Sequence, residues 1–529
     1  MTAQHFIGVD VGSASVRAGV FNPQGRRLAF AVRQISQFHP RPGVVEQSSQ
    51  QIWQHVCEAI QEAVQHAGIS PASVVSLGFD ATCSLVAVDR QGCGISVAED
   101  GDAGRDIIMW MDHRAVEETR AINATGDAAL AYVGGEVSVE MELPKVLWLK
   151  RNFPQRYQDA WRFFDLADYL VWRATGRDVA SVCTLTCKWN YLAHERRFSA
   201  SLLEAVNLTD VLDKVPRAIL ELGQSAGNLS QATAEQCGLT TAVTVAGGII
   251  DAHAGGLALV GSHPEGALAL ISGTSNCHML VSPREVHVPG VWGPYWGAML
   301  PDQWLSEGGQ SAAGALVDWT LRQHAVWPSL QQQAAERRCS EYRLLNEWVA
   351  DLERREPLPT RQLHVLADHY GNRSPRANPD ARGAVMGLTL EQGPDALARL
   401  YLATLQAIAY GTRHIIDAMN QSGHHITRLT ICGGATKNPL WLREYANVTG
   451  CDIALSAEDD VVTLGAALLG AVAAGSYPTL TEAARALVRP GDSIKADARY
   501  ADFHQAKYEV YLRMYDEEQQ AMDKMRPWL

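Results

Sequence analysis

Two stretches of the chain, about 260 residues apart, share one pattern, and this repetition constrains the fold more than any other feature. Phe6–Val20 and Ala267–Leu280 each read as an apolar strand, a short turn of glycine and hydroxyl residues, and a second apolar strand. Glycine allows a sharp turn and a close approach of the backbone to a ligand. Backbone N–H groups and hydroxyls in such a turn can hold phosphate oxygens. Either turn alone could be an ordinary hairpin, but the pair predicts a duplicated fold with a nucleotide between two halves.

Composition limits the classes of protein to consider. A length of 529 residues predicts two or more domains, and a charged fraction of 19% is ordinary for a globular protein. The net charge of −13 argues against nucleic acid or an anionic membrane as the main partner. No apolar run is long enough for a membrane span, and the first strand starts too early to leave room for a signal peptide. Ten cysteines without a CxxC pair predict free thiols and a cytoplasmic protein.

Strand and helix patterns alternate along both halves, which predicts an α/β fold with mixed sheets. The junction is expected in a packed helix near Ala252–Val260, which gives an N-terminal domain of residues 1–258 and a C-terminal domain of residues 259–529. The expected strands are 6–10, 16–21, 28–34, 74–80, 84–88, 242–250 and 428–432. The expected helices include 49–67, 114–123, 143–152, 311–324, 396–419, 462–474 and 502–525, with 331–356 rich in helix formers.

Four aspartates stand at or near expected strand ends: Asp10, Asp80, Asp112 and Asp251. In open α/β folds, ligands collect at the carboxyl ends of the strands. A carboxylate there can hold Mg²⁺ or accept a proton from a hydroxyl, although each Asp could instead be a turn or N-cap residue. The chain has no P-loop, no GxGxxG and no HExxH, so the commonest nucleotide and zinc motifs are excluded.

Five motifs, in order, resemble those of the FGGY carbohydrate kinases. They are Asp10–Arg17, Gly247–Ala258, Ser272–Ser275, Glu307–Ser311 and Cys432–Asn438. Each is weak alone, but together they extend the resemblance over essentially the whole chain. It implies two actin-like (ribonuclease-H-like) domains with a catalytic cleft between them, which binds a sugar and ATP. The same fold also serves nucleotide-dependent sensors, so a non-catalytic sensor is the alternative from another class.

The resemblance also implies roles for individual residues. Asp251 would be the general base that accepts the proton of the sugar hydroxyl, and Asp10 and Asp251 would hold Mg²⁺. The nucleotide contacts would be Gly12, Ser13, Ser15, Arg17, Gly273, Thr274, Gly314, Asp318, Gly433, Gly434, Ala435 and Asn438. The family includes dimers, and a homodimer is an option that the sequence leaves open.

The sugar side resembles the D-ribulokinase branch of the family. Thr82–Val86 looks like the signature of that branch, and His369–Pro375 is similar to the same group. The implied substrate contacts are Thr82, Cys83, Asp112, Lys188, Asp251 and Glu307. The predicted reaction is ATP-dependent phosphorylation of D-ribulose at O5, with L-ribulose, xylulose or ribitol as alternative substrates. Lys188 could instead be a surface lysine, and Thr82-Cys83 a detail of the strand turn.

Overall fold

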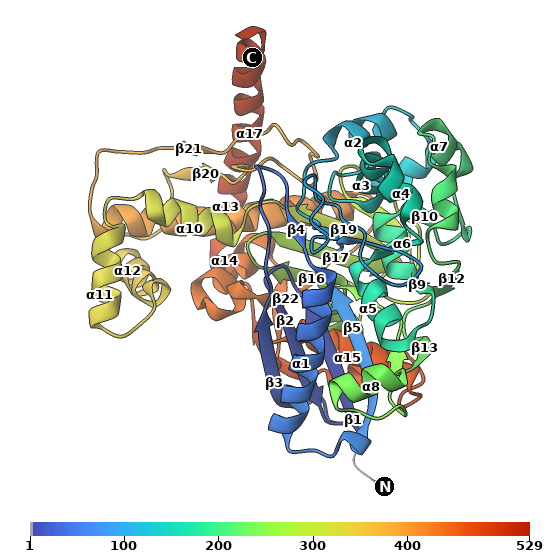
Figure 1. The fold of residues 1–529 in the computed structure, drawn as a ribbon. Helices are drawn as coiled ribbons and strands as arrows, with labels where there is room; N and C mark the ends of the chain where they lie inside the picture. Colours follow the sequence, from blue (N-terminus) through green and yellow to red (C-terminus); the bar gives the residue numbers. More distant parts are fainter. Residues whose placement is uncertain (1–3, 529) are drawn as a thin grey trace.

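The computed structural model describes residues 4–528 and contains two seven-stranded sheets (Figure 1). The first has the order β13-β14-β5-β1-β2-β3, with β15 beside β5, and the second has the order β18-β19-β17-β16-β22-β23-β24. The first comprises β1 (His5–Val11), β2 (Ser15–Phe21), β3 (Arg27–Gln34), β5 (Val74–Ala81), β13 (Ser225–Asn228), β14 (Thr244–Ala246) and β15 (Ile249–Ile250). The second comprises β16 (Ala267–Ser272), β17 (Asn276–Ser282), β18 (Trp292–Trp296), β19 (Trp304–Gln310), β22 (Arg428–Gly433), β23 (Asp452–Ser456) and β24 (Pro490–Ile494).

The two sheets repeat one topology. In the first, β1, β2 and β3 form an antiparallel meander, and β1 pairs in parallel with β5. In the second, β16, β17 and β19 form the meander, and β16 pairs in parallel with β22. The repeated hairpin of the sequence therefore marks a repeated sheet. The predicted α/β fold of two related halves is confirmed.

Helices cover these sheets and build the outer parts of both halves. Those up to the junction are α1 (Ser49–Ala67), α2 (Val116–Asn123), α3 (Glu142–Asn152), α4 (Pro154–Asp159), α5 (Leu166–Thr175), α6 (Val182–Lys188), α7 (Ala200–Ala205), α8 (Gln231–Cys237) and α9 (Asp251–Val260). The later ones are α10 (Gly314–Gln323), α11 (Trp327–Glu336), α12 (Glu341–Arg355), α13 (Pro394–Gln421), α14 (Pro439–Thr449), α15 (Val461–Ala473), α16 (Leu480–Leu487) and α17 (Ala501–Met525). A further sheet joins β4 (Glu46–Gln47), β7 (Ile107–Ile108), β6 (Leu85–Val88) and β8 (Arg162–Asp165). Short pairs are β9 (Val179–Ser181) with β12 (Ala218–Leu220), β10 (Tyr191–Leu192) with β11 (Arg197–Phe198), and β20 (His364–Leu366) with β21 (Ala384–Met386).

Helix α1 follows directly from its sequence. Ile52, Val56 and Ile60 recur at helical spacing and are buried where the helix packs against β2 and β3. Ser48 caps the N-terminus by accepting a hydrogen bond from the Gln51 N–H. Gly68, in the left-handed conformation, ends the helix. The predicted helix over 49–67 is confirmed.

Two helices join the halves. Helix α9 contacts both β5 and β16, and α15 packs against α9, β1 and β5 although it belongs to the second half by sequence. A Cβ at Gly8 would overlap the Thr463 carbonyl oxygen, and a Cβ at Gly465 would overlap the Ala254 carbonyl oxygen. Glycine is therefore required for this close approach of helices and sheet. A domain boundary after residue 258 would fall inside α9 and stays a prediction.

Some predicted elements are divided or begin later than expected. The strand expected over 242–250 is two strands, β14 and β15, separated by Gly247 and Gly248. The segment 331–356 contains two helices, because Ser340 caps a new one by accepting from the Arg343 N–H. The predicted helix at 311 begins only at Gly314.

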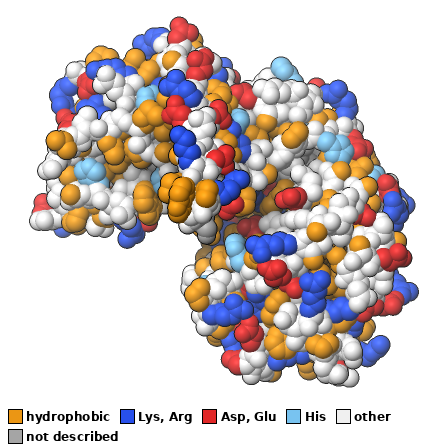
Figure 2. Space-filling model, turned by 90° about the horizontal axis from the view of Figure 1, so that it is seen from above, with side chains coloured by type: hydrophobic (Ala, Val, Ile, Leu, Met, Phe, Trp, Pro, Cys, Tyr) orange, Lys and Arg blue, Asp and Glu red, His pale blue; other side chains and the backbone are white. Residues whose placement is uncertain are grey.

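A deep cleft opens between two masses of the molecule in the space-filling view (Figure 2). A cavity of about 540 Å³ lies there, lined by residues of both halves, including Glu140 before α3, Trp292 of β18, and Arg373. Within residues 4–528, no helix is both long and apolar enough to cross a membrane. All ten cysteines are free, as predicted.

Candidate active site

The first hairpin turn is closed by its own backbone. The Gly12 N–H donates to the Ser15 carbonyl at 3.0 Å. The indole N–H of Trp110 donates to the Ser13 hydroxyl at 2.9 Å, and the Ser13 carbonyl accepts from the Gln47 amide at 3.1 Å. These bonds fix the loop between β1 and β2 at the edge of the sheet.

Carboxylates gather at the same edge. The parallel register of β1 and β5 places Asp10 opposite Asp80, and β15 runs beside Asp80 before the chain enters α9 at Asp251. Arg17 faces Asp10 across the hairpin, forms an ion pair with it, and reaches Asp460 at 2.6 Å. The topology thus brings together acids that are far apart in the sequence.

Two of these carboxylates, Asp80 and Asp251, have raised pKa values, and Asp10 and Asp80 have buried oxygens without a partner among the described residues. Burial, and then the nearby charge of Asp251, raise the pKa of Asp80 well above its usual range. Burial also raises the pKa of Asp251, although the Ala252 N–H, Arg17 and Lys188 oppose this effect. Oδ1 of Asp10 and both carboxylate oxygens of Asp80 are buried and lack a hydrogen-bond partner within the described part of the chain. Because Mg²⁺ prefers oxygen ligands, this set fits a magnesium ion.

The second hairpin forms a similar turn but has different neighbours. The Gly273 N–H donates to the Ser275 carbonyl at 2.9 Å. Helix α10 starts on this turn. The Gly314 N–H donates to the Gly273 carbonyl at 3.0 Å, and the Ala315 N–H donates to the Thr274 carbonyl at 3.2 Å. A Cβ at Gly314 would lie 2.7 Å from the Gly273 oxygen, so glycine is needed at this position.

The predicted adenosine residues lie beside that turn. Parallel pairing of β16 and β22 places Gly433 opposite Ser272. Gly433 has a φ of 89°, and a Cβ there would overlap the Ser272 carbonyl oxygen, so only glycine fits. Gly433 and Gly434 are exposed, whereas Ala435 is buried. The buried Asn438 caps α14, and its amide donates to the Tyr401 hydroxyl at 2.7 Å.

Lys188 and Glu307, the polar residues predicted to contact the sugar, are both buried. Lys188 ends α6 and is buried, with its ammonium 4.9 Å from the centre of the Trp292 ring. Glu307, on β19, lies 3.6 Å from the Arg373 guanidinium and 3.5 Å from His253 Nε2. Burial alone would raise the pKa of Glu307, but Lys188 and Arg373 outweigh it and lower that pKa. Lys188 is therefore not a surface lysine, which removes that alternative.

Comparison with known proteins identifies the architecture. Family models for the N-terminal and C-terminal domains of the FGGY family of carbohydrate kinases match residues 5–258 and 268–474. The chain belongs to the FGGY family of carbohydrate kinases. It is 42% identical to a human FGGY carbohydrate kinase domain-containing protein, over 98% of this chain and 97% of that one. It is 35% identical to a D-ribulokinase of Saccharomyces cerevisiae, over 90% of this chain and 72% of that one.

A solved structure supports the fold. The crystal structure of a xylulose kinase from Rhodospirillum rubrum superposes with a TM-score of 0.82 and 23% identity, covering 99% of each chain. The actin-like fold that the resemblance implied is therefore confirmed, as is membership in a family of sugar kinases. Members of the family use ATP, generally with Mg²⁺.

Not every predicted residue of this FGGY kinase lies in a position suited to its predicted role. Asp112 is fully buried, and its carboxylate binds Arg114 at 2.8 Å and accepts from the Val45 N–H at 2.7 Å. This arrangement favours a structural role over the predicted sugar contact. Asp318 forms an ion pair with Arg322 at 2.7 Å, one turn into α10.

Thr82 and Cys83 follow β5 and face inward. The Thr82 hydroxyl lies 3.2 Å from that of Ser84. Burial raises the pKa of Cys83 to about 12, although the charge of Lys188 opposes this, so Cys83 stays a neutral thiol.

Several residues of this region were not among the predicted site residues: Asp80, His253, Trp292, Arg373 and Asp460. Asp80 had a signal, its place at a strand end, and Arg373 stands in the His369–Pro375 motif. Asp460 had none, because its contact with Arg17 joins residues 443 positions apart.

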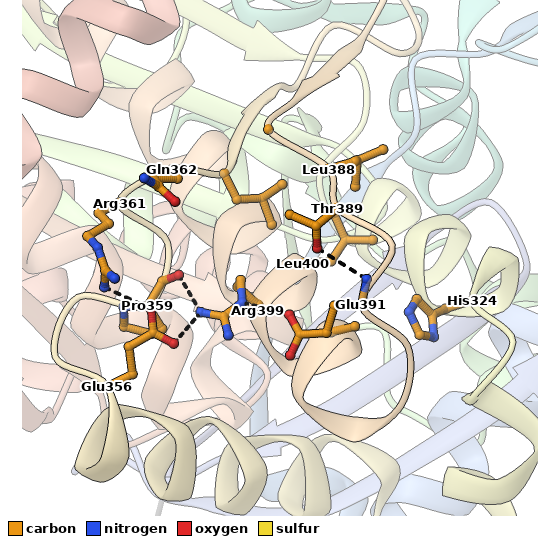
Figure 3. Close-up of a pocket in the computed structure, with 13 residues that line it drawn as sticks. His324, Glu356, Pro359, Arg361, Gln362, Leu388, Thr389, Glu391, Arg399 and Leu400 are labelled. Carbon is orange, nitrogen blue, oxygen red and sulfur yellow. Dashed lines mark hydrogen bonds and ion pairs between the residues drawn. The ribbon is translucent and has the colours of Figure 1, made fainter.

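A second cavity, of about 260 Å³, lies in the C-terminal half away from these residues (Figure 3). Its lining includes Arg399, which donates to the carboxylate of Glu356 at 2.9 Å and to the Pro359 carbonyl at 2.7 Å. The Thr389 hydroxyl accepts from the Glu391 N–H at 3.2 Å. None of the predicted catalytic, sugar or nucleotide residues lines this cavity.

Proposed function

We propose that this FGGY kinase transfers the γ-phosphate of ATP to O5 of D-ribulose, giving D-ribulose 5-phosphate and ADP. The observation that carries the proposal is the grouping of Lys188 and Glu307 with Asp251: the charges of Lys188 and Glu307 both act on the pKa of Asp251, and Lys188 lowers the pKa of Glu307. The yeast relative named D-ribulokinase supports the choice of sugar. A polar pocket of this kind discriminates strongly against substrates that lack a partner group.

Asp251 would accept the proton of the attacking hydroxyl. As the bond from O5 to the γ-phosphorus forms, the bond from that phosphorus to the bridging oxygen of ADP breaks, and the O5 proton passes to the Asp251 carboxylate. The raised pKa of Asp251 makes it a stronger proton acceptor than an ordinary aspartate. Lys188 and Glu307 would orient the sugar by hydrogen bonds to its oxygens.

Asp10 and Asp80, whose buried oxygens lack partners within the described chain, would hold Mg²⁺, with Asp251 nearby. When bound, the ion neutralises part of the charge on the phosphates. Arg17 and the N–H groups of the turns at Gly12 and Gly273 would contact phosphate oxygens. Closure of the cleft would exclude water, which otherwise competes with the sugar.

A coupled ADP-release assay tests the proposal. Mg·ATP is offered with D-ribulose, L-ribulose, D-xylulose, L-xylulose, ribitol, glycerol or no sugar. We expect the highest kcat/KM for D-ribulose by at least about tenfold, since a missing hydrogen-bond partner in a polar pocket is strongly discriminated against. Preference for another pentose or polyol would replace the substrate but keep the kinase. ADP release that is independent of sugar would favour the nucleotide-dependent sensor.

Lys188→Met tests the sugar side separately. The substitution removes the charge but keeps most of the volume, so KM for the sugar should rise by about tenfold or more while KM for ATP changes little. Both constants come from the same assay. Equal losses for sugar and ATP would assign Lys188 a structural role.

A further inference from the structure

Three side chains of types that can bind a metal lie together in the fold, and the proposed phosphoryl transfer uses none of them. Cys183 and Cys187 are one turn apart on α6, and His253 is the third residue of α9. Their sulfur and nitrogen atoms all lie within 4.8 Å of one another. The three residues are 0%, 0% and 1% exposed. Within residues 4–528 this is the only such group of three or more.

The distances match the ligand separations of a tetrahedral zinc site. With Zn–S bonds of about 2.3 Å and Zn–N bonds of about 2.0 Å, sulfur and nitrogen ligands at the tetrahedral angle lie about 3.5 Å apart. Sγ of Cys187 is 3.5 Å from Nε2 of His253. Three buried donors are thus already close to the arrangement that the ion requires.

Glu307 of β19 faces His253 but lies outside the cluster. Oε2 of Glu307 lies 3.5 Å from the same His253 nitrogen. This oxygen is buried and has no hydrogen-bond partner among the described residues. The cluster itself therefore contains two sulfurs and one nitrogen, with a carboxylate beside its histidine.

The donor set selects the ion. Zn²⁺ binds thiolate, imidazole and carboxylate ligands with four-fold coordination, whereas Mg²⁺ requires oxygen ligands. Binding to the two cysteines takes the thiolate form, so it releases one proton from each. The cluster thus differs in chemistry from the carboxylates at Asp10 and Asp80.

We propose that Cys183, Cys187 and His253 bind Zn²⁺, and that the bound ion inhibits sugar binding. Binding of the metal follows from the geometry of the three donors alone. Inhibition rests on the proposed function, because an ion held by His253 would attract the Glu307 carboxylate, 3.5 Å from the same nitrogen, away from the sugar. The two parts are tested by separate measurements.

Cobalt binding tests the site without any enzymatic activity. Metal-free protein, kept reduced by a phosphine that does not bind the ion, is titrated with Co²⁺. We expect visible bands typical of tetrahedral cobalt and a thiolate charge-transfer band in the near ultraviolet, which saturate at one ion per chain. One equivalent of Zn²⁺ should displace them. Absence of these bands would overturn the proposal.

A second pair of cysteines gives a matched control. Cys57 and Cys237 also lie next to each other and are buried, but no histidine or carboxylate completes a cluster there. The double variant Cys183→Ser/Cys187→Ser should lose the cobalt bands, and Cys57→Ser/Cys237→Ser should keep them. Cys183→Ala/Cys187→Ala and circular dichroism separate loss of ligands from loss of fold. Bands that persist without Cys183 and Cys187, or that vanish in the control, would contradict the site.

Inhibition is measured with the ADP-release assay at saturating Mg·ATP. Stoichiometric Zn²⁺ should raise KM for the sugar at least tenfold in the wild type and in the Cys57/Cys237 control. The Cys183/Cys187 variants should show no zinc-dependent change. Inhibition that persists in those variants would overturn the regulatory part. If no sugar is phosphorylated, the proposed function fails, and the cobalt bands still decide the metal site.

Discussion

The two hairpins have the same shape but carry different chemistry. The first, β1–β2, pairs Asp10 with Arg17 across its strands, and the second, β16–β17, pairs Ser272 with Asn276 at its end. The strand beside β1 supplies another carboxylate, Asp80, whereas the strand beside β16 supplies Gly433. The edge beside β1 therefore gathers carboxylates, whereas the edge beside β16 has a glycine in the corresponding place.

This difference shows how a duplicated unit can divide one task. Carboxylates suit a cation and a proton, and bare backbone suits the close approach of a nucleotide. Helix α9 contacts both sheets, and α15 packs against α9 and the first sheet, so the two helices hold the halves together. In the proposed function, proton transfer and cation binding fall to the first half, and the close approach to the nucleotide falls to the second.

The largest expected effect comes from Asp251→Asn, which removes the proton acceptor at the first edge. The turnover number, kcat, should fall by about 10³-fold, while the affinity for ATP stays within a factor of about three. Single-turnover kinetics and calorimetric titration of ATP measure the two quantities. Near-normal turnover would break the assignment of acid–base chemistry to this edge.

The second edge is tested by Gly433→Ala. A Cβ there would overlap the Ser272 carbonyl and impose a strained φ, so the affinity for ATP should fall by about tenfold or more. Gly423→Ala is a matched control, because Gly423 has a φ of 108° but nothing within 4 Å of its added Cβ. Both variants should lose some stability, and only the first should lose ATP binding. Equal ATP affinities would contradict the role of Gly433.

Asp80→Asn examines the buried charge of the first edge. Because folding raises the pKa of Asp80, its charged form opposes folding at every pH above the unfolded value of about 3.8. At pH 7 without Mg²⁺ the variant should therefore unfold at a temperature about 2 °C higher than the wild type. Mg²⁺ should stabilise the wild type more than the variant. Differential scanning calorimetry with and without Mg²⁺ measures both, and an unchanged response to Mg²⁺ would remove Asp80 from the metal site.

The smallest effect concerns His278 in the second hairpin. Burial, aided by the charge of Arg373, lowers the pKa of His278 to about 3, and its ring lies 2.9 Å from the Thr412 hydroxyl. The unfolded state then binds more protons below about pH 6.5, so stability falls as the pH drops from 6.5 towards 3. His278→Gln should weaken this fall. Urea unfolding at pH 7 and pH 5 measures the change in the free energy of unfolding for each protein. An identical change in the wild type and the variant would contradict the interpretation.

Local patterns were sufficient to predict much of the structure. Turns and amphipathic periodicity depend on residues close in the sequence. This made it possible to predict the hairpin at Gly12, the helix at 49–67 and the family motifs. The partner of Arg17 was not predictable, because Asp460 reaches it through the docking of α15 on the first sheet. The sequence predicted Asp112 as a substrate contact, but its partners Arg114 and the Val45 N–H, which bind its carboxylate, could not be read from its place in the chain.

The sequence by itself determined the α/β class, the duplication and the family, because periodic patterns and turn residues can be recognised in consecutive positions of the chain. Only the tertiary structure decided which polar groups meet. Strand register brought Asp10 to Asp80, and contacts between distant segments brought Cys187 to His253 and His253 to Glu307. Register and packing depend on contacts between distant segments, so the charge of each group, and with it the chemistry, is set by neighbours that no local pattern specifies.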